Sequence, residues 1–252
     1  MTEKFRPVAH HPPDSFVNSI KFYGRLLLDF QTLTIYKYIK KHIPSMQGRL
    51  LDVGCGNSPF KFLVNSNICQ YVGIDIEGAD NFDYQNEGIV TFDGENIPFE
   101  SESFENILCT EVIEHIPNPE KIIAEMYRVL KPNGLCIITL PWSARVHFAP
   151  YDFCRYTPYK LALLFQKFKK IDIQNRGTDI NTIVSKMIVL FFGSLLNWNF
   201  TVKDFLLIPS KVIFLILFAP FLGVFVLLSH LSLLLGLGST DDPLGYTITL
   251  VK

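Results

Sequence analysis

The stretch LLDVGCGNSPF, residues 50–60, decides the fold. Its apolar start predicts a β-strand, and this strand runs directly into a Gly-x-Gly turn at Gly54 and Gly56. Glycines at the carboxyl end of a parallel strand let the backbone turn tightly and approach a ligand closely. A dinucleotide-binding fingerprint would have a third glycine where this chain has Pro59. The stretch therefore predicts a strand and a tight turn that a ligand can approach, without that fingerprint.

Short β-rich runs alternate with helical runs from residue 49 to about residue 168. A helix is predicted between Pro119, which suits a first turn after the candidate cap Asn118, and the KPNG that follows Leu130. This alternation predicts a parallel sheet sandwiched by helices. The predicted strands are RLLDVG (49–54), QYVGIDI (70–76), GIVTFD (88–93), FENILCT (104–110) and GLCIITLP (134–141).

The rest of the composition sets broad limits. Residues 15–42 carry apolar residues at mixed spacings of three and four, which predicts one or two amphipathic helices ended by Pro44 and Gly48. The start of the chain lacks the pattern of a secretory signal, so we expect it to remain in the mature protein. Five cysteines without a C-x-x-C pair indicate reduced thiols in the cytosol. With 23 basic and 24 acidic residues, we expect no nucleic-acid partner.

Acidic residues end three successive predicted strands. They are Asp52, Asp75 and Asp93, and the carboxyl ends of parallel strands meet at one edge of a sheet. An aspartate at the end of the second strand can accept both hydroxyls of a ribose. Although an aspartate in a loop is often only a turn former, three of them on one rim favour a ligand site.

These features together resemble a class I S-adenosylmethionine-dependent methyltransferase of the type 11 kind. The matching segments are LDVGCG, VGIDI, FDGENIPFESESFENILCTEVIEHI and RVLKPNGLCIITLP, in that order. The resemblance implies an α/β, Rossmann-like fold with a seven-stranded, mostly parallel sheet and helices on both faces. It also implies that KKIDIQNRG (169–177) and LGYTITLVK (244–252) are the sixth and seventh strands, the seventh lying antiparallel between the fifth and sixth.

The same resemblance implies S-adenosylmethionine as the cofactor and assigns its binding residues. Gly54 and Gly56 would lie against the methionine moiety and adenosine, Asp75 would bind the ribose, and Asp93 would meet the adenine amino group. The expected set of cofactor-binding residues is Asp52, Gly54, Gly56, Asp75, Asp93 and Glu111.

The segment EVIEHI offers an alternative chemistry, because Glu111, Glu114 and His115 could share a divalent cation. This set resembles the metal-binding residues of small-RNA 2′-O-methyltransferases, whereas ubiquinone-biosynthesis O-methyltransferases carry such a segment without metal. Since the chain lacks the basic surface that RNA requires, the sequence favours the interpretation in which no metal is bound.

The segment HFAPYDFCRYTP, residues 147–158, resembles one in methyltransferases of surface-polysaccharide biosynthesis. It would place His147, Asp152, Arg155 and Tyr156 above the donor pocket. The simpler alternative is that Asp152 and Arg155 form a structural ion pair and that Thr157 caps a helix. A hydroxyl acceptor must lose a proton, and a positioned imidazole base typically contributes about 10²–10⁴-fold.

The candidate catalytic residues are therefore His147 and His115. The predicted activity is methyl transfer, as O-methylation of a membrane-proximal or lipid-linked glycan or a similar small acceptor. The alternative is a catalytically inactive donor-binding module that organises a membrane-bound biosynthetic complex.

The uncharged run VIFLILFAPFLGVFVLL, residues 212–228, lies between the sixth and seventh strands, so its chain must return to the side it left. Pro220 and Gly223 predict a break that leaves halves of roughly 21 Å and 24 Å, both shorter than the ~30 Å hydrocarbon core. We therefore expect residues 205–235 to form a broken hairpin in one leaflet of a membrane, entered from the cytoplasm. A soluble lid over an apolar acceptor pocket is the alternative.

The sequence thus predicts a cytoplasmic, membrane-associated protein in three parts. These are an N-terminal helical segment (1–44), a methyltransferase domain (45–178 and 244–252) and a hydrophobic helical insertion (179–243).

Overall fold

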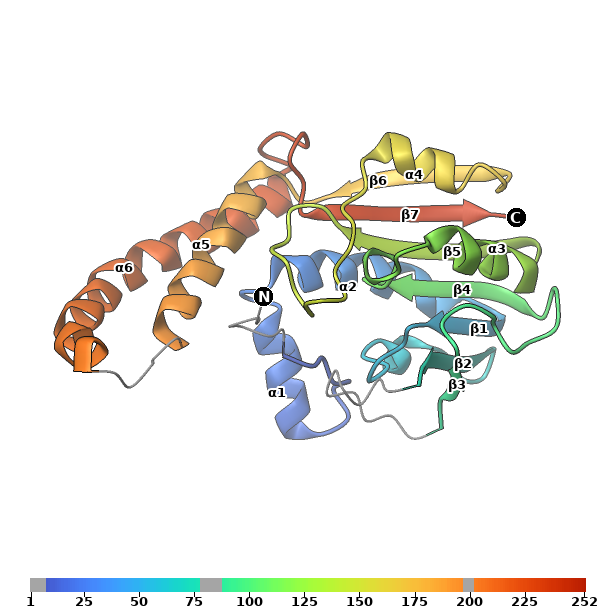
Figure 1. Ribbon diagram of the computed structural model, residues 1–252, viewed down its shortest axis with the longest axis horizontal. Helices are drawn as coiled ribbons and strands as arrows, with labels where there is room; N and C mark the ends of the chain where they lie inside the picture. The colour runs from blue at the N-terminus through green and yellow to red at the C-terminus, as the bar shows by residue number, and fades with distance from the viewer. Residues whose placement is uncertain (1–7, 78–87, 197–201) are drawn as a thin grey trace.

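The computed structural model describes residues 8–77, 88–196 and 202–252. Seven strands form one sheet in the order β3-β2-β1-β4-β5-β7-β6 (Figure 1). Only β7 runs antiparallel to its neighbours β5 and β6, which confirms the predicted fold class. The strands are β1 (Gly48–Val53), β2 (Cys69–Ile76), β3 (Val90–Phe92), β4 (Phe104–Thr110), β5 (Leu130–Pro141), β6 (Lys170–Arg176) and β7 (Gly245–Val251).

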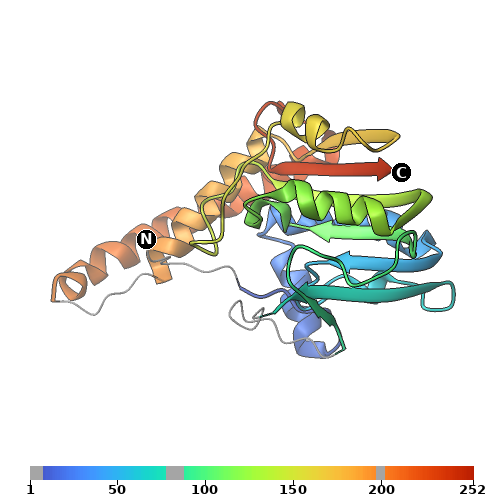
Figure 2. The ribbon, with the colours of Figure 1, turned by 45° about the vertical axis from the view of Figure 1, so that its right-hand side comes forward.

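Helices cover both faces of this sheet, as Figure 2 shows for α3 on one face and α2 behind the other. One buried core lies between the sheet and α3 and α4, and a second lies between the sheet and α1 and α2. The helices are α1 (Phe16–Arg25), α2 (Phe30–His42), α3 (Pro119–Val129), α4 (Pro158–Leu164), α5 (Asp179–Leu196) and α6 (Val202–Leu235).

Capping residues set where several of these helices begin. The predicted helical region at residues 15–42 divides at Asp29, whose Oδ1 accepts a bond from the Thr32 N–H and caps α2. Thr157 caps α4 as predicted, by accepting from Lys160 N. Asn118 occupies the cap position of α3, but its side chain makes no capping bond within the described part of the chain.

The predicted break inside the apolar run is wrong. α6 is one helix of 34 residues that continues through Pro220 and Gly223. A proline removes a single i→i−4 hydrogen bond and a glycine costs about 1 kcal/mol, so neither ends a helix that is otherwise built from long apolar side chains. The segment Val212–Leu235 is long and apolar enough to cross a membrane, by length and composition. Its 24 residues correspond to roughly 36 Å, so the expected short halves do not exist.

The chain leaves the sheet through α5 and returns to it through α6. α5 and α6 pack as an antiparallel pair. Near the start of α5, Asn181 Nδ2 donates to the Ser229 carbonyl of α6 over 2.9 Å. Farther along, the rings of Phe191 and Phe218 stack with centroids 5.9 Å apart. This hairpin, formed by residues 179–196 and 202–235, leaves from the end of β6, comes back to the start of β7 and projects away from the sheet (Figure 1).

Candidate functional site

The site lies at the sheet edge where β1, β2, β4 and β5 end. Val53 at the end of β1 pairs with Ile74 of β2, so the Gly-x-Gly turn lies beside the end of β2. Gly54 has a φ of +67°, and an added Cβ would come within 2.5 Å of Val112 Cγ2. The turn therefore needs glycine both for its backbone conformation and for space.

Asp75 joins the end of β2 to this turn. Its Oδ2 accepts from the Gly56 N–H over 2.7 Å, and its Oδ1 accepts from the Ile76 N–H over 2.8 Å. The side chain is buried, and this burial raises the pKa of its carboxyl. Sequence reasoning thus placed the glycine turn and the Asp75 carboxylate together correctly.

Asp52 is buried beside them. Its Oδ2 accepts from the Tyr71 hydroxyl over 2.6 Å, whereas its buried Oδ1 has no hydrogen-bond partner in the described residues. Burial raises the pKa of this carboxyl to about 7. Sequence reasoning missed Tyr71, although its position inside the predicted second strand, next to the strand that carries Asp52, was a usable signal.

Asp93 lies at the same rim but is exposed and bonded within its own loop. Its Oδ1 accepts from the Glu95 and Asn96 amides over 2.8 and 2.6 Å, and its Oδ2 accepts from Asn96 Nδ2. Bonds from Asn96 and from the Glu95 amide lower its pKa to about 2. Asp93 thus forms its own turn, and its contact with a cofactor stays a prediction.

Glu111, which follows β4, is held by a cation that sequence reasoning missed. Arg176 NH2 lies 2.7 Å from Glu111 Oε1, and the Arg176 side chain is buried. The same guanidinium donates to the carbonyls of Gln31 and Leu140. The only sequence signal was an arginine at the end of a predicted strand. Glu111 therefore lies at the rim as part of a structural ion pair.

Glu114 belongs to the 3₁₀ turn η4 (Ile113–His115), just after β4. The side chain is 0% exposed, and neither carboxylate oxygen has a hydrogen-bond partner among the described residues. Burial and the neighbouring Glu111 raise the pKa of this carboxyl. Its backbone carbonyl accepts from the Phe153 and Cys154 amides, which attaches the loop after β5 to η4.

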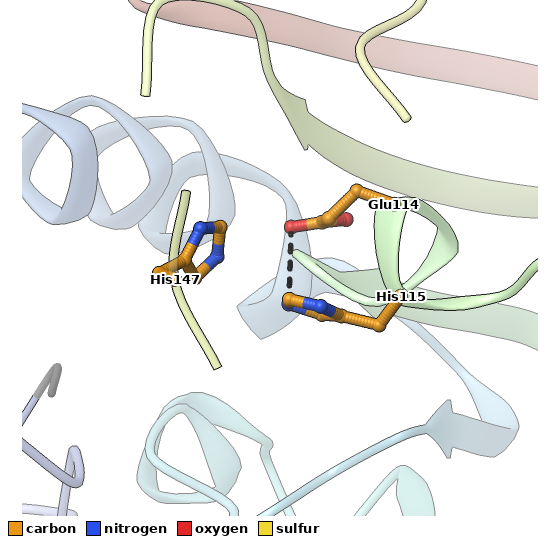
Figure 3. A group of neighbouring side chains, drawn as sticks. All are labelled: Glu114, His115 and His147. Carbon is orange, nitrogen blue, oxygen red and sulfur yellow. Dashed lines mark ion pairs between the residues drawn. The ribbon is translucent and has the colours of Figure 1, made fainter. Parts of the chain in front are cut away.

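His115 and His147 meet beside Glu114, although 31 residues separate them in the chain (Figure 3). Their ring centroids lie 4.8 Å apart. His115 Nε2 is 3.7 Å from Glu114 Oε1, and burial lowers the pKa of His115 to about 4. The structure thus brings together both predicted catalytic histidines and one glutamate of the EVIEHI segment, while Glu111 is engaged by Arg176.

The loop that carries His147 is organised by Asp152. Arg155 donates to both Asp152 oxygens, over 2.6 and 2.8 Å, and forms the ion pair that the simpler alternative describes. Asp152 Oδ2 also accepts from the His147 amide over 3.0 Å. Tyr156 is buried, and its hydroxyl has no partner among the described residues. These contacts hold His147 over the ends of the strands.

A separate cavity lies at the opposite edge of the sheet, where it is lined by His42, Gln47 and Asn133 among others. Parallel α/β folds bind ligands at the carboxyl ends of their strands. The glycine turn, Asp75 and the two histidines all lie at that carboxyl end, so we assign the site there.

Comparison with known proteins agrees with this geometry. Residues 51–138 match the family model described as a methyltransferase domain. The chain is 32% identical over 126 residues to an uncharacterised methyltransferase of Mycobacterium marinum, an alignment that covers 47% of this chain and 49% of that protein. The chain thus spans about half the length of the curated relatives it matches first.

Solved structures share the fold over nearly the whole chain. A SAM-dependent methyltransferase from Archaeoglobus fulgidus aligns with a TM-score of 0.52 and 15% identity, covering 94% of this chain and 99% of that one. Phosphoethanolamine N-methyltransferase 2 of Haemonchus contortus, in complex with S-adenosyl-L-methionine, aligns with the same TM-score and identity, covering 94% and 59%. The matched region is thus similar to methyltransferase domains, and the chain shares the Rossmann-like fold of these solved methyltransferases.

Proposed function

We propose that this chain is an S-adenosylmethionine-dependent methyltransferase that methylates an oxygen of a small acceptor at a membrane surface. A glycan or similar group on a carrier lipid is the acceptor class that fits best. The observation that carries the proposal is the Asp75 carboxylate, bonded to the Gly56 amide at the carboxyl ends of β1 and β2.

The residues present at this edge fit the donor. Gly54 and Gly56 leave the backbone of the turn open to close approach, and Asp75 offers a carboxylate for two ribose hydroxyls. Oδ1 of Asp52, which has no hydrogen-bond partner among the described residues, adds a buried polar atom at the end of β1. When bound, S-adenosylmethionine supplies an electrophilic methyl group on its sulfonium.

His115 and His147, which lie above the ends of β4 and β5, are the residues that would act on the acceptor. Methyl transfer is a single in-line displacement, so the protein chiefly positions the acceptor oxygen. That oxygen must also lose its proton, and an imidazole held in place at this position supports such a step. The loop fixed by Asp152 and Arg155 holds His147 for this task.

Membrane contact is supported by two apolar surfaces. Along α6, large side chains face outward, such as Ile216 at 68% and Phe221 at 63% exposure. The outer face of α1 is also apolar, with Phe16 82% exposed and Ile20 58% exposed. The His230 side chain of α6 bonds to the Leu27 carbonyl just after α1, which joins the two surfaces. Soluble proteins rarely expose so much contiguous apolar area.

The membrane-bound orientation favours an acceptor that is itself attached to a membrane. The hairpin would enter from the cytoplasmic side, and the carboxyl ends of the strands would then lie near the bilayer. A soluble protein in which α6 covers an acceptor pocket is the competing arrangement, and it predicts recovery without detergent.

Transfer of labelled methyl from S-adenosylmethionine into a membrane lipid and glycan extract tests the activity. We expect a product one methyl heavier by mass spectrometry, absent with Asp75→Ala. Donor binding without any methylated product would instead support an inactive module that organises a biosynthetic complex.

A further inference from the structure

Three potential ligands of a cation converge above the end of β4. Glu114, His115 and His147 each place one ligand atom within 4.8 Å of the others (Figure 3). Two of them come from η4 and the third from the loop after β5, so the cluster forms only when that loop lies on η4.

The Glu114 carboxylate is the strongest sign of a missing partner. It is 0% exposed, and both oxygens lack a hydrogen-bond partner among the described residues. Buried carboxylates are ordinarily paired with a cation, hydrogen-bonded or bound to a metal. The nearest basic atom is His115 Nε2, at 3.7 Å from Glu114 Oε1, which is too long for a hydrogen bond.

Both imidazoles are held in the way that metal-binding histidines are held. His115 Nδ1 lies 2.6 Å from the Tyr151 carbonyl. His147 Nδ1 lies 3.1 Å from the Arg145 carbonyl. His147 Nδ1 also lies 3.2 Å from Asp152 Oδ2. These acceptors hold both rings in place, and a proton on Nδ1 would leave the Nε2 lone pair for a metal.

The surrounding charges permit a cation at this place. Arg155 NH2 lies 3.5 Å from His147 Nδ1, but Asp152 engages both terminal nitrogens of Arg155 over 2.6 and 2.8 Å and offsets the charge. Glu111 is held by Arg176 and is not a ligand in this arrangement. The cluster therefore differs from the Glu111, Glu114 and His115 set that the sequence suggested.

We propose that Glu114, His115 and His147 bind one divalent transition-metal cation, whose open coordination positions receive the acceptor hydroxyl. Two imidazoles and one carboxylate suit Zn²⁺, Fe²⁺ or Co²⁺, whereas Mg²⁺ prefers oxygen ligands. This replaces the metal-free interpretation favoured by the sequence and builds on the proposed methyltransferase function.

The cation gives the cluster a defined role in the transfer. An oxygen bound to such a cation releases its proton near neutral pH. The acceptor oxygen loses that proton to solvent and forms a bond to the methyl carbon, while the carbon–sulfur bond breaks with its electron pair left on sulfur. His115 and His147 then serve as ligands rather than as a free base.

Calorimetry on the detergent-solubilised full chain, first treated with a chelator, tests the site. We expect one equivalent of Zn²⁺ to bind and Mg²⁺ to bind far more weakly. Glu114→Gln, His115→Ala and His147→Ala should each weaken Zn²⁺ binding at least about tenfold. The control His42→Asn, at the opposite edge of the sheet, should bind as the unaltered chain does.

Donor affinity measured on the same samples separates the possible failures. Donor binding by His147→Ala at the unaltered affinity would show that the variant is folded. Absence of stoichiometric Zn²⁺ binding, or binding that all three variants retain, would overturn the cation site while leaving the donor site intact. Zn²⁺ bound through the cluster, in a chain that binds no donor, would support the cation site and contradict the methyltransferase function.

Discussion

Arg176 NH2 lies 2.7 Å from Glu111 Oε1, so the end of β6 is joined to the end of β4 across β7 and β5. The guanidinium is buried, whereas Glu111 keeps partial contact with solvent. Removing the carboxylate leaves a buried cation without its acidic partner.

We expect Glu111→Gln to lower the free energy of unfolding by about 1–3 kcal/mol, because the hydrogen bond to a charged group is lost. Urea unfolding followed by circular dichroism measures the change. The control Glu95→Gln removes an exposed ion pair with Lys121 and should leave the unfolding midpoint unchanged. Equal midpoints for both variants would contradict a structural role for the Arg176 pair.

Asp75→Ala should lose at least tenfold in affinity for S-adenosylmethionine. Two charge-assisted bonds to the ribose contribute about 1.5–3 kcal/mol each. Asp93→Asn should lose less, since the Asp93 carboxylate is exposed to water, whereas Asp75 is buried. Calorimetry compares the two variants, and an unchanged affinity in folded Asp75→Ala would remove this residue from the donor site.

Asp52 should make folding stability depend on pH. Burial raises its folded pKa to about 7, so the folded state holds a proton that the unfolded chain releases near pH 4. Its contribution to stability is present below the unfolded pKa and is lost as pH rises toward the folded pKa, by on the order of a few kcal/mol.

Asp52→Asn keeps an acceptor for Tyr71 and removes this titration. Urea unfolding at pH 5 and pH 7.5 should show that the unaltered chain loses more stability over this interval than the variant does. The difference between the two slopes isolates Asp52 from other groups, such as His115, whose lowered pKa acts in the opposite direction. Parallel slopes would mean that Asp52 is ionised in the folded chain.

Single cysteines can locate the hairpin relative to a bilayer. In a background with the partly buried Cys154 replaced, we expect Ile216→Cys to be protected in membranes and labelled in detergent. Ser239→Cys, near the sheet, should be labelled from the cytoplasmic side. Recovery of the chain in the soluble fraction without detergent would favour the lid arrangement.

Gly193→Cys, near the far end of α5, distinguishes two depths of insertion. We expect protection from both sides, which would place Gly193 inside the bilayer. Labelling from the opposite side would show a full crossing, for which the roughly 36 Å of Val212–Leu235 is long enough.

Local sequence patterns were sufficient to predict the strands and the edge of the sheet that carries the glycine turn and Asp75. Alternation of β-rich runs with helices determines a parallel sheet, and the glycine turn and Asp75 then fall at one edge because parallel strands end there. The Asp152–Arg155 pair and the Thr157 cap were predictable since both act over three residues.

Contacts between distant segments were not predictable in this way. Arg176 contacts Glu111, 65 positions away in the chain, and nothing in a single sequence indicates that these two residues pair. The break predicted at Pro220 is absent because α6 packs against α5, a contact that the local sequence does not reveal. His115 and His147 meet only because of the path that the loop after β5 takes, and local sequence patterns do not predict that path.

The two arms of the hairpin leave the sheet at a single rung, where Arg176 of β6 pairs with Gly245 of β7. Only residues 177–178 separate β6 from α5, so no long tether lies between this arm of the hairpin and the edge that carries the candidate site. With the hairpin seated in a bilayer as proposed, the domain could not tumble freely above it. Its acceptors would then arrive by lateral diffusion in two dimensions, with the encounter rate set by their surface density.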